Sequence, residues 1–113
     1  MEFEKFEELF LLLEKHREKD ETCIELYADV KECAYKYADM RYRFSEMNRE
    51  EKIENDSYRT SLHNRFMDSV RIYLRYLQKN GIDTPDIKKL EEDRKNFGNF
   101  ACYFIFRIEF EQA

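Results

Sequence analysis

The chain has 113 residues, of which 40% are charged and 42% hydrophobic, and its net charge is −5. Two glycines and one proline are too few for an all-β fold, which needs turn residues about every ten positions. The hydrophobic content argues against disorder. We therefore expect one all-α domain, a compact bundle of four to five helices over residues 1–113. The negative charge argues against wholesale binding to nucleic acids or membrane surfaces.

No apolar stretch approaches the roughly 20 residues of a membrane-spanning helix, and the acidic, amphipathic N-terminus does not resemble a signal peptide. We therefore expect a cytoplasmic protein without membrane association. The odd number of cysteines, three, agrees with this expectation. Cys23 and Cys33 would lie about 15 Å apart on one helix, too far for a disulfide, so the cysteines are interpreted as small buried hydrophobic residues.

A first helix is expected over about residues 2–19, with an apolar seam that includes Phe6, Phe10 and Leu13. Acidic residues fill its first turns and basic residues its last, which suits the helix dipole at both ends. His16 in the last turn is therefore interpreted as a C-terminal cation rather than as part of a site.

The second expected helix, residues 22–47, is the most regular, with Thr22 and Glu25 as its capping box. Its apolar residues recur in steps of three and four from Cys23 to Met47. A second row lies beside them, so that the apolar arc covers roughly 200° of the helix; this row is Ile24, Ala28, Tyr35, Ala38 and Tyr42. Either the last helix or another copy of the protein covers this flank. Ile24, Tyr35 and Tyr42 are the candidate interface residues.

The polar wall of this helix carries one acidic row, and two of its members have basic partners four residues later. The row is Glu25, Glu32, Asp39 and Glu46. We interpret it as a solvated face, because a metal site would need histidine partners that are absent here. Arg41 falls inside the apolar arc, so its head group must either reach outward or find an acidic partner.

The turn before the third helix is expected within residues 48–57, with capping by Asn48 and Glu51, or by Asn55 or Ser57. That helix continues to about Lys79 and stops at Asn80-Gly81. Residues 57–82 carry five basic residues and one acid. The simplest interpretation is that these cations face acidic neighbours or water. The alternative is a phosphate- or RNA-facing ridge of Arg71, Arg75 and Lys79.

Thr84 and Pro85 are expected to open a fourth helix, with a kink or break near Glu91 before the last one. Gly98 within the last helix costs about 1 kcal/mol relative to alanine, which a close helix–helix approach would explain. Residues 104–111 nearly alternate between apolar and polar, as a strand does. We expect a helix there, because a lone strand would have no partner.

Common catalytic motifs are absent, and neither of the two histidines belongs to the Glu-x-x-His pairs of di-iron bundles. We therefore expect no metal and no cofactor. One cluster of polar residues is a candidate site. It consists of Arg59 and His63, which lie one helical turn apart, together with Asp93 and Arg94. The first interpretation is a buried polar network that fixes helix register. The second is a general acid or base with an anion-binding arginine, in which Asp93 orients His63 or pairs with Arg59.

Two resemblances bear on this group. The small, dimeric, all-helical RNases of the HEPN type carry Arg, four to six residues, and then His. Here only three residues separate Arg59 from His63, so that resemblance carries no catalytic assignment. About half of the chain resembles a family of small all-helical bacterial proteins without an established activity, through Arg59-x-x-x-His63, Arg75-Tyr76 and Asp93-Arg94-Lys95-x-x-Gly98-x-Phe100-Ala101-Cys102-Tyr103. This second resemblance implies a helical fold and singles out Arg59, His63, Asp93, Arg94 and Gly98.

The sequence thus favours a non-enzymatic helical interaction module that associates with itself or with a protein partner. The alternative is a protein that binds RNA, or cleaves it as HEPN proteins do, through Arg59 and His63.

Overall fold

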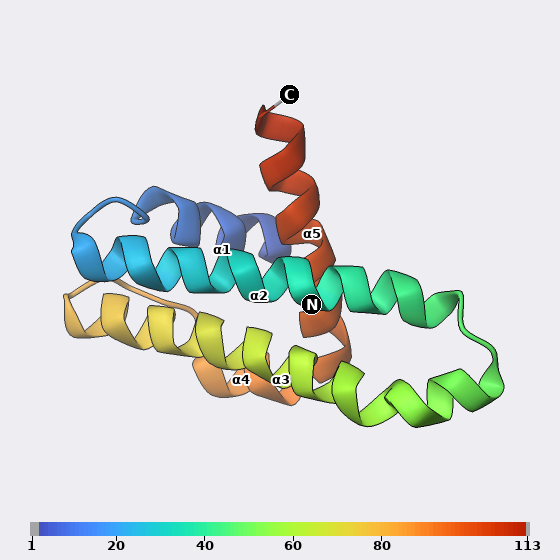
Figure 1. Cartoon of the computed structure of the whole chain (residues 1–113). Coiled ribbons are helices and arrows are strands. Elements are labelled where there is room, and N and C mark those ends of the chain that lie inside the picture. Colours follow the sequence, from blue (N-terminus) through green and yellow to red (C-terminus); the bar gives the residue numbers. More distant parts are fainter. Residues whose placement is uncertain (1–2, 113) are drawn as a thin grey trace.

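A computed structural model describes residues 3–112, and every regular element in that range is a helix (Figure 1). The helices are α1 (Phe3–Lys15), α2 (Glu21–Ser45), α3 (Arg49–Lys79), α4 (Ile87–Glu92) and α5 (Arg94–Gln112). α4 is a single short segment of six residues. The expected all-α bundle is confirmed.

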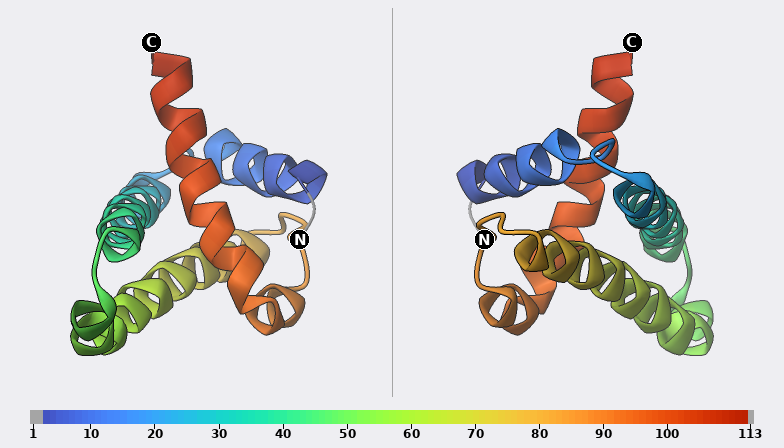
Figure 2. Two further views of the ribbon diagram at one scale, coloured as in Figure 1. Left: turned by 90° about the vertical axis from the view of Figure 1, so that its right-hand side faces the viewer. Right: turned by 90° about the vertical axis from the view of Figure 1, so that its left-hand side faces the viewer.

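The two longest helices, α2 and α3, form an antiparallel hairpin that sets the long axis of the molecule (Figure 1). α1 packs against α5, and α4 lies beside α3 (Figures 1 and 2). α5 runs across this assembly and passes between α1 and α2, and its C-terminal end stands clear of the other helices in both views of Figure 2. α5 therefore contributes both to the core and to the outer surface.

The core lies between α1, α2, α3 and α5, and many of its side chains are aromatic rings. Phe10, Phe66, Phe100 and Phe104 are fully buried. The rings of Phe10 and Phe104 meet edge to face with centroids 5.4 Å apart, an arrangement that adds to the burial energy of the rings. The hydroxyl of the buried Tyr73 donates to the carbonyl of Leu13 at 2.8 Å, so the last turn of α1 is fixed to α3.

The start of α2 differs from the expected capping box. Asp20, not Thr22, is the N-cap, and its carboxylate accepts the backbone N–H of Cys23 at 2.8 Å. The same carboxylate accepts the hydroxyl of Tyr76 on α3 at 2.7 Å. This tertiary contact fixes Asp20 as the cap, and the helix therefore begins at Glu21. α1 ends at Lys15, earlier than expected, and turns lead from it to α2.

The ends of α3 agree with the sequence. Asn48 and Glu51 form the reciprocal capping box, which fixes the preceding turn at the first of the candidate positions. Gly81 follows the helix with a φ of +80°, a left-handed conformation that glycine adopts without strain.

The start of α4 does not agree with the sequence. Thr84 does not cap this helix; Asp86 accepts the backbone N–H of Lys88 at 3.0 Å instead, and α4 begins at Ile87. The chain from Gly81 to Pro85 is not helical, so Pro85 precedes the helix rather than opening it.

The break near Glu91 is confirmed, because α4 ends at Glu92 and α5 begins at Arg94. α5 remains helical through residues 104–111. Phe104 and Ile108, four residues apart, are both buried, which shows the helical spacing that the alternating pattern obscured.

Candidate functional site

The sequence-predicted residues Arg59, His63 and Arg94 come together in one cleft between α2, α3 and the first turn of α5. The cleft has a volume of about 450 Å³ and is lined by Tyr37, Arg41, Arg59, Thr60, His63, Arg94 and Lys95. Four of these lining residues are permanently charged cations, and none is an acid. In a chain with a net charge of −5, the cleft is a local concentration of positive charge.

His63 forms part of the cleft wall and is only 9% exposed. Its Nε2 lies 2.8 Å from the backbone carbonyl of Arg94. A carbonyl can only accept, so Nε2 carries the proton and donates it. The other ring nitrogen, Nδ1, is buried and has no hydrogen-bond partner among the residues that the structure describes. His63 therefore presents one unused hydrogen-bonding group, which is rare in a buried side chain.

The surroundings of His63 favour its neutral form. Burial lowers the pKa of His63, and the positive charges of Arg94 and Arg59 lower it further, although the bond to the Arg94 carbonyl and the nearby Asn64 side chain act in the opposite direction. The imidazole is thus neutral near pH 7 and gains a proton only under more acidic conditions. The ring is held edge-on against Tyr37, with centroids 5.3 Å apart.

Arg59 and Arg41, the two half-buried arginines of the cleft, are held differently. The guanidinium of Arg59 pairs with Asp56 at 2.9 Å and lies 4.6 Å from the ring centroid of Phe44. The guanidinium of Arg41 donates to the side-chain oxygen of Asn99 at 2.7 Å. Arg41 thus finds an amide rather than an acid, and no ion pair to it occurs in the described part of the chain.

Asp93 is placed at the start of α5 but does not line the cleft. Its carboxylate accepts the side-chain amide of Asn96, with both oxygens 3.1 Å from Nδ2. His63 bonds to the backbone of Arg94 rather than to this carboxylate, and Arg59 pairs with Asp56. The two partnerships expected for Asp93 are therefore replaced by others. The guanidinium of Arg94 donates to Asn64.

Gly98 explains how α5 comes close enough to form this cleft. A Cβ at this position would lie 2.8 Å from the hydroxyl oxygen of Tyr37 and 3.3 Å from Cδ2 of His63. Nonbonded carbon and oxygen atoms do not normally approach so closely. The close approach expected from a mid-helix glycine is confirmed, and Gly98 packs against Tyr37 and His63, two of the residues that line the cleft.

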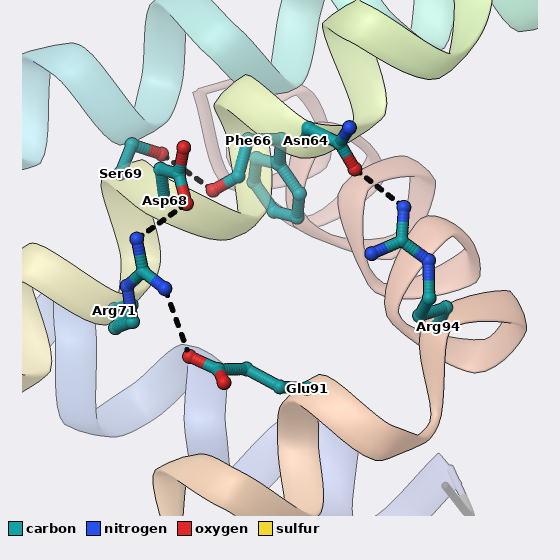
Figure 3. A network of polar contacts seen from close by, with 7 residues as sticks. All are labelled: Asn64, Phe66, Asp68, Ser69, Arg71, Glu91 and Arg94. Atoms are coloured by element: carbon teal, nitrogen blue, oxygen red, sulfur yellow. Dashed lines mark hydrogen bonds and ion pairs between the residues drawn. The ribbon is translucent and has the colours of Figure 1, made fainter.

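The predicted basic ridge on α3 is shorter than its sequence suggests. Figure 3 shows Arg71 between two carboxylates, Asp68 at 2.6 Å and Glu91 at 3.3 Å. The ion pair between Arg71 and Glu91 therefore joins α3 to α4. Arg75 and Lys79 are exposed and remain as the cations of the ridge, which does not extend to the cleft.

Sequence reasoning did not assign Tyr37, Arg41 and Lys95 to the site. Arg41 carried a usable signal, since a cation inside an apolar arc must have a polar partner. Tyr37 carried none, because its spacing is that of an ordinary core residue. Lys95 lies beside Arg94 in the quoted pattern, but its sequence position does not indicate which side of α5 it occupies.

Among the side chains that the structure describes, no group of three or more His, Cys, Asp or Glu residues is arranged to hold a metal ion. None of the helices within residues 3–112 is both long and apolar enough to cross a membrane. Comparison of the chain with models of known families, with curated proteins and with solved structures finds no match.

Proposed function

We propose that the chain is a non-enzymatic helical interaction module, and that it associates with a second copy of itself through the outer face of α2. The observation that carries this proposal is a partly exposed stripe on α2 in which larger residues and alanines are spaced symmetrically about the middle of the helix. The three candidate interface residues belong to it: Ile24 is 51% exposed, Tyr35 36% and Tyr42 70%.

The stripe consists of residues in steps of four, three, four, three and four, which place it on one face of the helix; it is Ile24, Ala28, Lys31, Tyr35, Ala38 and Tyr42. These six positions form three pairs at equal distances on either side of position 33. The outer pair is large, the next pair is alanine on both sides, and the inner pair is Lys31 with Tyr35. Residue size therefore follows the same order from either end of the stripe.

This symmetry is what a twofold interface requires, because each residue at one end of the face meets the residue at the other end in the partner copy. In an antiparallel pair of α2 helices, Ile24 faces Tyr42 of the second copy, and the alanines at positions 28 and 38 allow the two backbones to approach. The ammonium group of Lys31 faces the ring of Tyr35, a favourable cation–π pair. An arbitrary protein partner would not require this order of residues.

The projecting end of α5 also carries exposed aromatic rings. Phe106 and Phe110 contact each other there with ring centroids 5.1 Å apart, yet are 55% and 73% exposed. α5 reaches α2 at Tyr35, whose pKa is raised by burial and by the carboxylate of Glu109. A helix that is apolar on all sides normally lies within a larger core. A second copy seated on α2 beside this end of α5 would supply the missing neighbour.

Opposite charges introduced at Ile24 and Tyr42, the outer pair of the stripe, test the proposal. By sedimentation velocity and light scattering, we expect the natural chain to form dimers. Ile24→Glu should weaken the dimer by at least about tenfold, because it places an unpaired charge in both outer contacts of the twofold interface. Ile24→Glu combined with Tyr42→Lys should restore association, because the introduced carboxylate of one copy then faces the introduced ammonium of the other.

The matched control is Ile72→Glu on α3, because Ile72 is 51% exposed, the same fraction as Ile24. This control should dimerise as well as the natural chain. A natural chain that stays monomeric at millimolar concentration would contradict the proposal, and so would equal weakening by Ile24→Glu and Ile72→Glu.

RNA binding or HEPN-like cleavage is the second candidate function, favoured by the cations of the cleft around His63. Two of its expected residues have other partners, however: Arg59 pairs with Asp56 and Arg71 with Asp68 and Glu91. The short ridge and the small cleft offer no continuous track for a nucleic-acid strand. Retention of a labelled single-stranded RNA at physiological salt, lost in Arg75→Gln with Lys79→Gln, would support this second function.

A further inference from the structure

We propose that the cleft around His63 binds the terminal phosphate group of a small phosphate monoester, and that protonation of His63 accompanies binding. This site lies on a different side of α2 from the self-association stripe: Tyr37 and Arg41 line the cleft, whereas Ile24, Tyr35 and Tyr42 point outward. It goes beyond the proposed function and is tested separately from it.

The charge of the cleft points to an anion. Arg41, Arg59, Arg94 and Lys95 surround a volume of about 450 Å³ without an acidic lining residue. Among these cations, only Arg59 has a carboxylate partner in the described range. Arg41 is oriented by an amide, Asn99, and Arg94 by another, Asn64. Amide partners orient a guanidinium but leave its positive charge uncompensated.

Phosphate is the anion that fits this arrangement best. Guanidinium groups bind phosphate oxygens through paired charge-assisted hydrogen bonds. A monoester carries close to two negative charges at pH 7, which better balances several cations than the single charge of an internal phosphodiester or a carboxylate. The volume also falls in the range of small-molecule sites.

The first turn of α5 also favours the binding of an anion. Arg94 and Lys95, which line the cleft, are the first two residues of that helix, and the N–H groups of a first turn carry a partial positive charge. The Asp93 carboxylate precedes this turn but accepts the Asn96 amide. The helix end therefore adds to the side-chain cations, and the site does not depend on it alone.

His63 makes the site sensitive to pH. When neutral, the ring donates from Nε2 to the Arg94 carbonyl and leaves Nδ1 as a buried, unpartnered acceptor. When protonated, the ring adds one positive charge to the wall of the cleft, while Nδ1 itself stays buried. Tyr37 from α2 contacts the ring, Arg59 and Arg94 act on it electrostatically, and Arg41 and Lys95 line the same cleft. A bound phosphate offsets the repulsion between these cations and the imidazolium, so phosphate and proton favour each other's binding.

Titration of the whole chain with AMP tests the proposal, with adenosine as the matched ligand without phosphate. Calorimetry should show binding of AMP and not of adenosine, and tighter binding at pH 6 than at pH 8. The chain has two histidines, so NMR can follow both imidazoles. AMP should raise the pKa of His63 and leave that of His16 unchanged.

Variants of two exposed cations test the site without disturbing the core. Arg94→Gln and Lys95→Gln should each weaken AMP binding, by about tenfold for the loss of one charge-assisted contact. Arg75→Gln, which removes an exposed arginine of α3 outside the cleft, should not. His63→Gln should bind AMP more weakly at pH 6 than at pH 8, because only the protonation of the phosphate, whose second pKa is about 6, then remains.

Three outcomes would overturn the proposal. AMP and adenosine binding equally would show that the phosphate is not recognised. Equal weakening by Arg75→Gln and Arg94→Gln would show a diffuse basic surface only. Tighter binding of a 5′-hydroxyl oligouridylate, which carries only internal phosphodiesters, would assign the cleft to an RNA strand instead. Inorganic phosphate competing with AMP would support the proposal.

Discussion

At the scale of single residues, Gly98 shows how one missing side chain determines the site. α5 crosses α2 and α3 closely enough to form the cleft only because position 98 has no Cβ. Two side chains of the cleft, Tyr37 and His63, occupy the space that a larger residue would need. Gly98 therefore lowers the intrinsic stability of α5 as a helix, but it allows α5 to approach α2 and α3 and so to complete the cleft.

Replacement of this glycine should destabilise the fold despite the gain in helix propensity. Gly98→Ala should gain about 1 kcal/mol from propensity but lose about 1–3 kcal/mol from overpacking against Tyr37 and His63. We expect a net loss of about 1 kcal/mol in the free energy of unfolding, measured with urea.

The matched background for that measurement is Tyr37→Phe, which removes the oxygen atom that the new methyl group would meet at 2.8 Å. Gly98→Ala should cost less there, and the double-mutant cycle gives the difference. A gain in stability of the full propensity value in the natural background would show that α5 is not held as closely as described.

At the scale of elements, the ends of the helices show where sequence reasoning succeeds and where it fails. Asn48 with Glu51, and Gly81 after α3, act through neighbouring backbone groups alone, so local spacing identifies them. Asp20 caps α2 while it also accepts the hydroxyl of Tyr76, and that contact across 56 residues has no local signature. Thr84 failed as a cap for a similar reason, since the path from α3 to α4 is set by packing.

The cap of α3 offers a direct test at this scale. Asn48→Ala removes the acceptor of the Glu51 N–H, which lies 2.9 Å from the Asn48 side chain, and should cost about 1 kcal/mol in the free energy of unfolding. Asn55→Ala is the matched control: Asn55 was the competing candidate for the cap and lies within the helix. It should change stability by less than about 0.5 kcal/mol. Equal losses in both variants would contradict the assignment of the cap.

At the scale of the whole molecule, composition and periodicity were sufficient for the fold class, because helices that bury apolar stripes are fixed by local spacing. The site was harder to predict. Arg59 and His63 share a helix face and could be paired from the sequence, whereas the part played by Arg41 depends on how α5 crosses α2. α5 itself has apolar residues on every side, so its periodicity does not reveal the crossing. The outer stripe of α2 was visible in the sequence, and only the structure shows that the chain's own helices leave it exposed.

His63 makes the stability of the whole molecule depend on pH. Its pKa in the folded chain is lowered, chiefly by burial, whereas the unfolded chain has the ordinary value near 6.5. As pH falls below about 6.5, the unfolded chain takes up the proton first, so the free energy of unfolding decreases until the folded pKa is reached. The contribution of His63 is fully present above pH 6.5 and is lost in more acidic solution.

We therefore expect the midpoint of urea unfolding to fall between pH 7.5 and pH 5, and to fall less in His63→Gln. His16→Gln is the control, because the pKa of His16 is also lowered, by slight burial and by Lys15 and Lys19, and this variant removes only that part. Asp20, whose pKa is lowered from 3.8, loses its contribution at lower pH, outside this interval.

AMP should reduce the fall in the natural chain, because a bound phosphate favours the protonated form of His63. A fall that is the same in His63→Gln would show that this imidazole takes up its proton equally well in both states, and the burial described here would then not control its charge.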